Sequence, residues 1–255
     1  MIDFPKIIHF IWVNFKNELD SKPIIPQKYL DNLENIKKIN SNYQIKIWNG
    51  YDCNEFIKKY FPNKLNLYWK FPYPIQRCDY VRFLILYIYG GIYSDFDRYS
   101  VKSYDLILDK YNNYNVILGK LPYIQIINND IIITKPNDKF ILKCINHITI
   151  YNFYYYFIDV CATTGPIYLM KMYYQYKDLS KIKLLSSELN PCTWCNCDVN
   201  NMDKIVSYTT LDNSWLEKKN NNFFSITIFS FIICNFTLVI SFIIIVFLFY
   251  KLYKK

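Results

Sequence analysis

Histidine, arginine and glycine are scarce in this chain of 255 residues. Only two histidines are present, His9 and His147, which excludes a metal site built from several histidines. Glycine occurs five times, too rarely for a Walker-type phosphate loop or a glycine-repeat fold. Lysine is spread along the whole chain, whereas the three arginines, Arg77, Arg82 and Arg98, fall within 22 residues. The arginines therefore mark one window of the sequence as specialised.

The charge balance indicates a lysine-rich surface solvated by water. Lysine and arginine total 30 against 21 acidic residues, which gives a formal net charge of +9. A basic balance can serve nucleic acid, a membrane surface or an acidic substrate. Because the lysines form neither a basic helix nor an aromatic RNA-binding pattern, we expect no nucleic-acid partner.

The eight cysteines leave two interpretations open. A chain of this length can bury a core and fold without disulfide bonds. The cluster Cys192-x-x-Cys195-x-Cys197 could hold a structural zinc ion or form local disulfides. It lacks a second cysteine pair at zinc-finger spacing, which favours buried or disulfide-bonded cysteines over zinc.

Positions 223–250 form a run of 28 residues without a charged side chain, and 20 of them are Ile, Leu, Val or Phe. At 1.5 Å per residue, a helix of this length exceeds the ~30 Å hydrocarbon core of a bilayer. The run predicts a C-terminal transmembrane helix and a single-pass membrane protein. Residues 1–216 then form one soluble domain, 217–222 a polar linker and 251–255 a basic tail. Lysines flank the helix on both sides, so charge leaves its orientation open.

A shorter aromatic stretch occupies residues 151–157. Asp159 and the pair Gly165-Pro166 interrupt it, so it does not predict a second membrane span. We expect these aromatic side chains either in the core or on a surface beside the bilayer, where tyrosine is favoured.

Strand and helix patterns alternate along the soluble domain. Such alternation predicts an α/β layered architecture. Strands are expected at 6–12, 43–48, 116–118 and 131–134, and helices at 54–60, 77–89, 140–151 and 167–177.

The most informative stretch is YPIQRCDYVRFLILYIYGGIYSDFD, residues 73–97. Its helix is expected to end at Gly90, because glycine tolerates the left-handed conformation there. The following strand ends in Asp95 and Asp97, whose side chains point the same way in an extended chain. Two such carboxylates can face one hard cation and link it to a diphosphate, which a nearby arginine could clamp as well. A lone D-x-D is a weak signal, but α/β proteins bind ligands outside the carboxyl ends of strands.

This stretch resembles the sugar-binding region of the DxD-containing glycosyltransferases, which include the fungal initiating mannosyltransferases. The resemblance spans about residues 4–216 and implies a GT-A-type nucleotide-sugar-binding domain with a mixed sheet. It implies Mn²⁺ or Mg²⁺ bound by Asp95 and Asp97, with Arg82 as a further catalytic residue. Matching motifs imply donor contacts from Ile11, Trp12, Asp79, Arg82, Tyr93, Asp95, Ser214 and Trp215, and an acceptor side formed by Asn129 and Asp130.

Within the family, Tyr73-Pro74-Ile75-x-Arg77 and the apolar run after Ser214-Trp215 most resemble the catalytic subunits of mannosyl inositol phosphorylceramide synthases. Thr164-Gly165-Pro166 resembles the family's TGP motif. Thr209 stands where many members have a histidine, and the ceramide-type members also lack it. The resemblance implies a retaining enzyme of ER- or Golgi-type membranes that moves mannose from GDP-mannose to an inositol phosphorylceramide-like lipid. It also admits a regulatory membrane subunit.

Alternatives remain for the donor, the acceptor and the class of protein. The donor could be UDP-glucose or UDP-galactose, and the acceptor a protein or polysaccharide glycan. A non-catalytic membrane protein that binds sugar nucleotides is an alternative of another class. Retention of the D-x-D motif at Asp95 and Asp97 favours the enzyme, because an inactivated member is expected to lose it.

Overall fold

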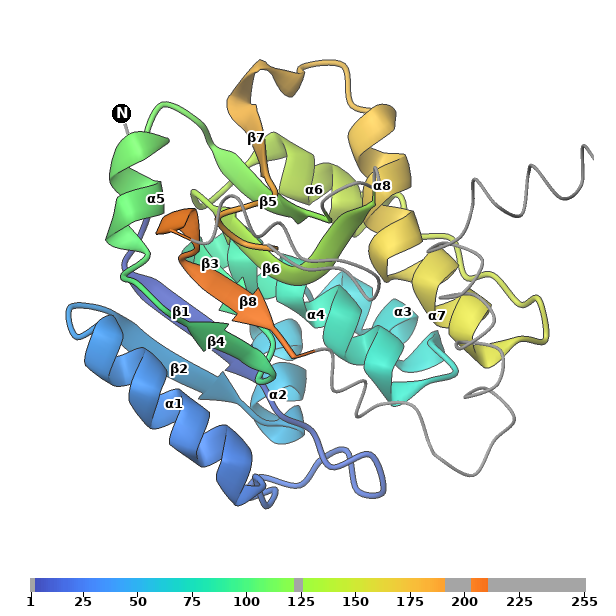
Figure 1. The fold of residues 1–255 in the computed structure, drawn as a ribbon. Helices are drawn as coiled ribbons and strands as arrows, with labels where there is room; N and C mark the ends of the chain where they lie inside the picture. Colours follow the sequence, from blue (N-terminus) through green and yellow to red (C-terminus); the bar gives the residue numbers. More distant parts are fainter. Residues whose placement is uncertain (1–2, 122–125, 191–202, 211–255) are drawn as a thin grey trace, which may run out of the picture.

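The computed structural model describes residues 3–121, 126–190 and 203–210. Its centre is a six-stranded mixed sheet in the order β2-β1-β3-β6-β5-β7 (Figure 1). β2, β1 and β3 run parallel, β6 is antiparallel to β3 and β5, and β7 is parallel to β5. The predicted α/β class and mixed sheet are confirmed. The strands are β1 (Ile7–Ile11), β2 (Gln44–Trp48), β3 (Gly91–Ser94), β5 (Val116–Lys120), β6 (Ile127–Thr134) and β7 (Ile182–Leu185), with β4 (Arg98–Ser100) and β8 (Ser207–Thr209) paired in a separate antiparallel ribbon.

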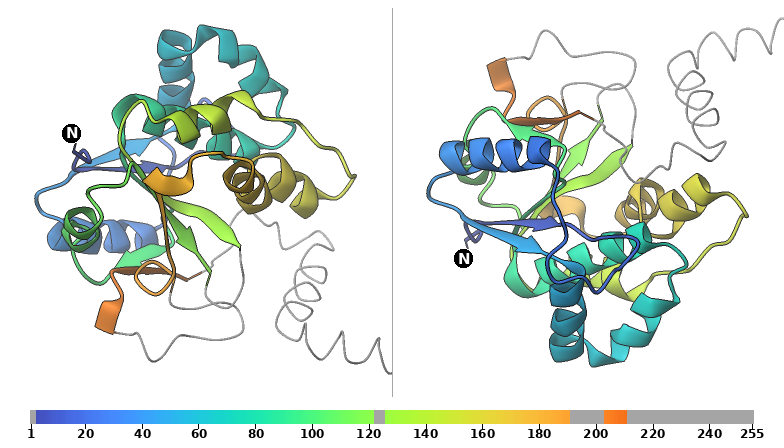
Figure 2. Two further views of the ribbon diagram at one scale, coloured as in Figure 1. Left: turned by 90° about the horizontal axis from the view of Figure 1, so that it is seen from above. Right: turned by 90° about the horizontal axis from the view of Figure 1, so that it is seen from below.

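Helices cover both faces of the sheet (Figure 2). Alternate strand residues point to opposite faces, so Ile132 enters one apolar cluster and its neighbours Ile131 and Ile133 the other. The first cluster includes side chains of α2, α3, α4, α6 and α8, and the second includes those of α1 and α5. The helices are α1 (Gln27–Ile39), α2 (Gly50–Tyr60), α3 (Leu65–Lys70), α4 (Pro74–Tyr89), α5 (Asp105–Lys110), α6 (Lys139–Asn146), α7 (Tyr156–Thr163) and α8 (Pro166–Tyr174), with short 3-10 turns at Pro62–Lys64 and Leu179–Lys181.

The turn between α4 and β3 places the D-x-D motif. α4 ends at Gly90, as predicted, and Gly90 and Gly91 both have positive φ, at 61° and 87°. A Cβ atom at Gly91 would lie 2.6 Å from the backbone oxygen of Ile7. The double glycine therefore lets β3 start directly beside β1.

The structure differs from the sequence prediction in several helices. α2 and α4 begin earlier than expected, at Gly50 and Pro74, and α3, α5 and α7 were not predicted. The helix expected over 140–151 ends at Asn146, because Ile148, Thr149 and Ile150 form a β-branched run that disfavours helix. The helix expected over 167–177 ends at Tyr174. α1 was not predicted, although Tyr29, Leu33 and Ile36 recur at helical spacing; one of its three buried positions is the polar Asn32.

Several predicted features lie outside the described residues. They are the transmembrane helix at 223–250, the linker and basic tail that flank it, Ser214-Trp215 and the cysteine cluster at 192–197. Within the described ranges, the helices are all too short or too polar to cross a bilayer.

His9, on β1, is fully buried and neutral. Its Nε2 donates to the backbone oxygen of Gly90 (3.1 Å), and its Nδ1 accepts from the indole nitrogen of Trp48 (3.2 Å). A second ring proton would face the indole donor. Burial lowers the pKa of His9 to about 4, Lys46 adds to the shift, and the bond to Gly90 opposes it.

We expect acid to destabilise the fold through His9. Its pKa is lower in the folded state than the usual 6.5, so stability is present above pH 6.5 and is lost as pH falls towards 4. The full loss is about 3 kcal/mol. Thermal unfolding of the parent and His9→Gln should therefore show a Tm difference that narrows from pH 7 to pH 4. His147→Gln, at an exposed position, is the control. A Tm difference between the parent and His9→Gln that stays constant from pH 7 to pH 4 contradicts the prediction.

Candidate active site

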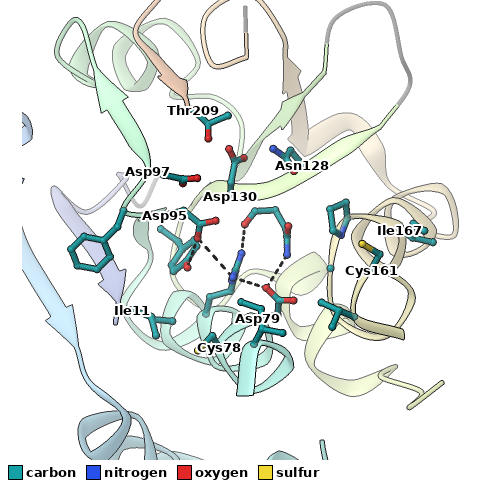
Figure 3. A pocket seen from close by; sticks show the side chains of 18 of the residues that line it. Ile11, Cys78, Asp79, Asp95, Asp97, Asn128, Asp130, Cys161, Ile167 and Thr209 are labelled. Atoms are coloured by element: carbon teal, nitrogen blue, oxygen red, sulfur yellow. Dashed lines mark hydrogen bonds and ion pairs between the residues drawn. The ribbon is translucent and has the colours of Figure 1, made fainter. Parts of the chain in front are cut away.

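A pocket opens where the carboxyl ends of β1 and β3 meet the amino-terminal part of β6. Figure 3 shows Asp95, Asp97, Asp130 and Thr209 gathered on one side of it, and Cys161 and Ile167 on the opposite side. Its walls therefore divide into a carboxylate-rich side and an apolar side. The lining includes Ile11, Val13, Phe15, Tyr29, Ile75, Asp79, Arg82, Tyr93, Asp95, Phe96, Asp97, Asn129, Asp130, Phe157, Val160, Cys161, Pro166, Ile167 and Thr209.

The D-x-D loop is held by backbone and side-chain hydrogen bonds. Asp95 N donates to Asp130 O (2.9 Å), and Arg98 N donates to Asp95 O (3.2 Å). The side-chain amide of Asn32, from α1, donates to the backbone oxygens of Phe96 (2.9 Å) and Arg98 (2.8 Å). The loop that carries both aspartates is thus fixed from the sheet on one side and from α1 on the other.

Asp95 is the carboxyl at the start of this loop, and its pKa is raised. Its Oδ1 accepts a hydrogen bond from the hydroxyl of Tyr93 (2.6 Å). Enclosure by the pocket walls raises its pKa to about 7; the Arg82 guanidinium opposes the shift, and the carboxylates of Asp97 and Asp130 add to it. A cation beside these carboxylates would relieve their repulsion.

Asp130 brings a third carboxylate to the same side of the pocket. Its Oδ2 pairs with Arg98, whereas its buried Oδ1 has no hydrogen-bond partner among the described residues. An unpartnered carboxylate oxygen beside two further carboxylates fits a hard divalent cation. The described part of the chain contains no group of three His, Cys, Asp or Glu side chains spaced as a complete metal site. Such a cation would therefore need oxygen ligands from a bound diphosphate or from water.

Arg98 is completely buried behind the D-x-D loop. Its guanidinium donates to Asp130 Oδ2 (2.6 Å), Asn190 Oδ1 (2.6 Å), Leu189 O (2.5 Å) and the hydroxyl of Ser207 (3.1 Å). One side chain thus joins β4, β6, β8 and the segment after β7.

Arg82, on α4, is buried and engaged by protein groups. Its Nη2 lies 2.5 Å from Asp79 Oδ1 and 3.8 Å from Asp95 Oδ1, and its Nη1 donates to the backbone oxygen of Asn129. Its guanidinium carbon lies 4.3 Å from the centre of the Tyr93 ring. Arg82 is therefore a buried side chain paired with protein groups, and it places positive charge behind Asp95.

Asp79 lies deeper, on the same turn of α4. Asn129 Nδ2 donates to its Oδ1 (3.1 Å) and the Thr164 hydroxyl donates to its Oδ2 (2.9 Å). Burial raises the pKa of Asp79, while Arg82, Thr164 and Asn129 oppose the shift. Thr164, known from the sequence only as part of a TGP motif, thereby ties the start of α8 to α4.

The end of β1 forms an aromatic wall. Ile11 lines the pocket, but Trp12 does not; its ring packs 5.2 Å from Tyr29 and 5.3 Å from Phe96, which do line it. The Trp12 indole also donates to the backbone oxygen of Ile24 (3.0 Å). Trp12 therefore supports the wall from behind.

Arg77 fixes the loop that follows β1. It makes a bidentate ion pair with Glu18, with nitrogen–oxygen distances of 2.6 and 2.5 Å, and also donates to the backbone oxygen of Phe71. The same loop carries Val13 and Phe15, which line the pocket. This long-range pair could not be read from the sequence.

The structure brings most of the predicted site residues together. Asn129 lies against Asp79, and Asp130 lies beside the D-x-D motif. Their place on the acceptor side stays a prediction. Sequence reasoning missed most of the apolar side of the pocket, because Phe157, Val160, Cys161 and Ile167 carry no motif; only Gly165 and Pro166 belong to a motif read from the sequence. The predicted residues found in the lining are Ile11, Asp79, Arg82, Tyr93, Asp95, Asp97, Asn129 and Asp130.

Comparisons with known proteins agree with this geometry. Residues 26–114 match the family described as the glycosyltransferase sugar-binding region containing the DXD motif. The chain is 29% identical over 175 residues to mannosyl phosphorylinositol ceramide synthase SUR1 of Saccharomyces cerevisiae, which covers 68% of this chain and 42% of that protein. It is 30% identical over 177 residues to inositol phosphoceramide mannosyltransferase 3 of Schizosaccharomyces pombe, covering 69% of this chain and 46% of that protein.

The chain spans less than half the length of these two curated relatives. Among solved structures it is similar to the PaToxG glycosyltransferase, with 19% identity, a TM-score of 0.47 and coverage of 68% of this chain and 69% of that one. The resemblance inferred from the sequence is confirmed by the family match and by the fungal relatives.

Proposed function

We propose that this chain, whose residues 26–114 match the glycosyltransferase sugar-binding region containing the DXD motif, is a metal-dependent, retaining glycosyltransferase anchored in a membrane. The proposed reaction transfers mannose from GDP-mannose to an inositol phosphorylceramide-like lipid. The observation that carries the proposal is the pocket in which Asp95, Asp97 and Asp130 face an apolar wall. The names of the two fungal relatives support the choice of sugar and acceptor.

The carboxylates would hold a divalent cation, Mn²⁺ or Mg²⁺, at the diphosphate of the donor. When bound, such a cation supplies Lewis-acid stabilisation of the charge that develops on the leaving nucleoside diphosphate. In this proposal Asp95 and Asp97 are the protein ligands of the cation. Arg82, whose Nη2 lies 3.8 Å from Asp95 Oδ1, adds positive charge from behind Asp95.

The buried cluster around Asp79 would orient the sugar. Arg82, Asn129 and Thr164 hold the Asp79 carboxylate in one position. A sugar hydroxyl that donates a hydrogen bond to this carboxylate would therefore require little reorganisation of the protein. Retention rests on the family resemblance.

The apolar wall would receive the acceptor. Phe157, Val160, Pro166 and Ile167 line the pocket from α7 and α8. In Figure 3 Cys161 of α7 and Ile167 of α8 lie across the pocket from the carboxylates. A headgroup joined to hydrocarbon chains fits such a divided pocket better than a fully polar glycan does, because the wall offers few hydrogen-bond partners.

Paired acceptors test the proposed reaction. The full-length chain is supplied with GDP-mannose and manganese, and with either inositol phosphorylceramide in mixed micelles or a soluble mannose oligosaccharide. We expect mannose transfer to the lipid and loss of transfer when the metal is chelated. Transfer to the oligosaccharide alone would overturn the lipid acceptor, and transfer only from UDP-glucose or UDP-galactose would overturn the donor. Donor binding without turnover on any acceptor would identify a non-catalytic binding protein.

Residues 223–250 are the proposed anchor, in a membrane of the ER or Golgi type. A regulatory membrane subunit is a further proposed partner. Co-purification from detergent-solubilised membranes tests the subunit, and resistance of the full chain to carbonate extraction tests the anchor.

A further inference from the structure

The loop between α6 and α7 exposes an unusual number of aromatic side chains. Tyr154 is 90% exposed, Phe153 54% and Tyr155 44%. Ile158 on α7 and Ile167 on α8 are also exposed. We call this set of five residues the aromatic surface. A contiguous exposed apolar patch on a folded domain marks an interaction site more often than a random surface.

The loop is held in place by buried groups. The carboxylate of Asp159, which is itself buried, accepts a hydrogen bond from Phe153 N (2.5 Å). The Thr163 hydroxyl accepts one from Tyr151 N (3.1 Å), and the Tyr151 and Phe153 rings stack with centres 5.6 Å apart. The projection is therefore built into the fold.

Tyr154 occupies the exposed tip of this loop in a left-handed backbone conformation, with φ of 59°. This conformation is uncommon for a residue other than glycine. The side-chain oxygen of Asn152 accepts a hydrogen bond from Tyr154 N (3.1 Å) and holds the turn. The fold thus holds Tyr154 in an unfavourable backbone conformation in which its ring is exposed to solvent.

The aromatic surface continues into the pocket. Ile167 belongs to both: it lines the pocket and is 43% exposed. Phe157, Val160 and Pro166 extend the same apolar wall inward. A molecule lying against the aromatic surface would therefore have an apolar path to the carboxylates.

The chemistry of this surface suits a bilayer. No charged residue occurs from Ile148 to Ile158, and tyrosine is favoured where hydrocarbon meets headgroups. At the edge, Lys171 Nζ lies 3.0 Å from the Tyr151 hydroxyl and could meet an anionic headgroup.

The length of chain between the pocket and the apolar run fits this placement. Thr209 lines the pocket, and the uncharged run begins at Phe223, 14 residues later. At ~3.5 Å per residue the pocket lies at most about 50 Å from the start of that run. We propose that the aromatic surface inserts into the interfacial region of the membrane and sets the pocket at the level of the lipid headgroups. This inference rests on the membrane location proposed above.

Depth-dependent quenching tests the inference without requiring turnover. Tyr154→Trp is introduced into the full chain, which is reconstituted into phosphatidylcholine nanodiscs with or without brominated acyl chains. The matched control is Leu106→Trp on α5, which is 56% exposed on the opposite side of the molecule (Figure 2). The signal is the fluorescence that the added tryptophan contributes above the parent protein.

We expect the tryptophan at position 154 to lose about half of its added fluorescence in brominated nanodiscs, and that at position 106 to lose none. Equal fluorescence at position 154 in both kinds of nanodisc overturns the inference; if its emission is also blue-shifted, the surface is covered by protein instead. A chain that does not co-purify with nanodiscs overturns it too. Quenching without mannose transfer would contradict only the proposed reaction, and transfer without quenching only the membrane contact.

Discussion

Replacing Asp95 or Asp97 by asparagine is expected to lower transfer by at least ~1,000-fold, about 4 kcal/mol of transition-state stabilisation. Each carboxylate supplies a hard, charged oxygen to the proposed cation, and the neutral amide supplies a weaker one. Manganese affinity, measured by calorimetry, should fall in parallel. Turnover that stays unchanged at limiting manganese in either variant rules out the metal assignment.

The same variants should remain folded. The pKa of Asp95 is raised in the folded protein, so its charge opposes folding at neutral pH, and Asp95→Asn should leave the Tm equal or higher. Asp109→Asn, at an exposed position of α5, is the matched control and should change neither Tm nor transfer. A large drop in Tm for Asp95→Asn would show that the carboxylate stabilises the fold. The loss of activity would then be due to unfolding and not to the loss of a metal ligand.

Arg98→Met is expected to cost about 3–5 kcal/mol of folding free energy, because it strands the buried Asp130 carboxylate without its cation. For a chain of this size that corresponds to a fall in Tm of ~10 °C. Thermal unfolding of the full chain measures it. Lys37→Met is the matched control. It removes a positive charge at an exposed position of α1, leaves no buried carboxylate unpaired and should leave the Tm unchanged.

A double variant separates the ion pair from simple packing. Arg98→Met combined with Asp130→Asn removes the stranded charge, so part of the lost stability should return. The double variant should still transfer poorly, since Asp130 lines the pocket beside the D-x-D motif. If the two changes are additive in Tm, the pair contributes no coupling and Arg98 acts only by filling space.

The sequence could predict what depends on local geometry. Gly90 ends α4 and a strand follows it, and these features need only neighbouring residues. The strand was expected to reach Asp95 and Asp97, but β3 ends at Ser94 and Asp97 lies in the turn that follows, so the extended-chain argument for their side chains was wrong. The mixed sheet was expected from the family resemblance. Pairing of β6 between β3 and β5 supplies Asn129 and Asp130 to the pocket from far along the chain.

What the sequence could not give depends on contacts between distant residues. Asn32 lies in a segment for which no helix was predicted, yet its amide fixes the D-x-D loop across 64 positions. Thr164 reaches Asp79 across 85 positions. Hydrophobic periodicity does not predict such hydrogen bonds, because each partner is a polar residue of a common type and nothing near it in the sequence indicates a distant partner.

The three arginines share a feature that affects how the protein reacts with chemical probes. Arg77, Arg82 and Arg98 are each less than 9% exposed in the folded chain, while lysines populate the surface. A dicarbonyl reagent such as phenylglyoxal, which modifies guanidinium groups, therefore finds no accessible target until the fold opens. The rate of arginine modification consequently measures the opening of the domain around the pocket, whereas amine-directed reagents react mainly with lysines on the outer surface.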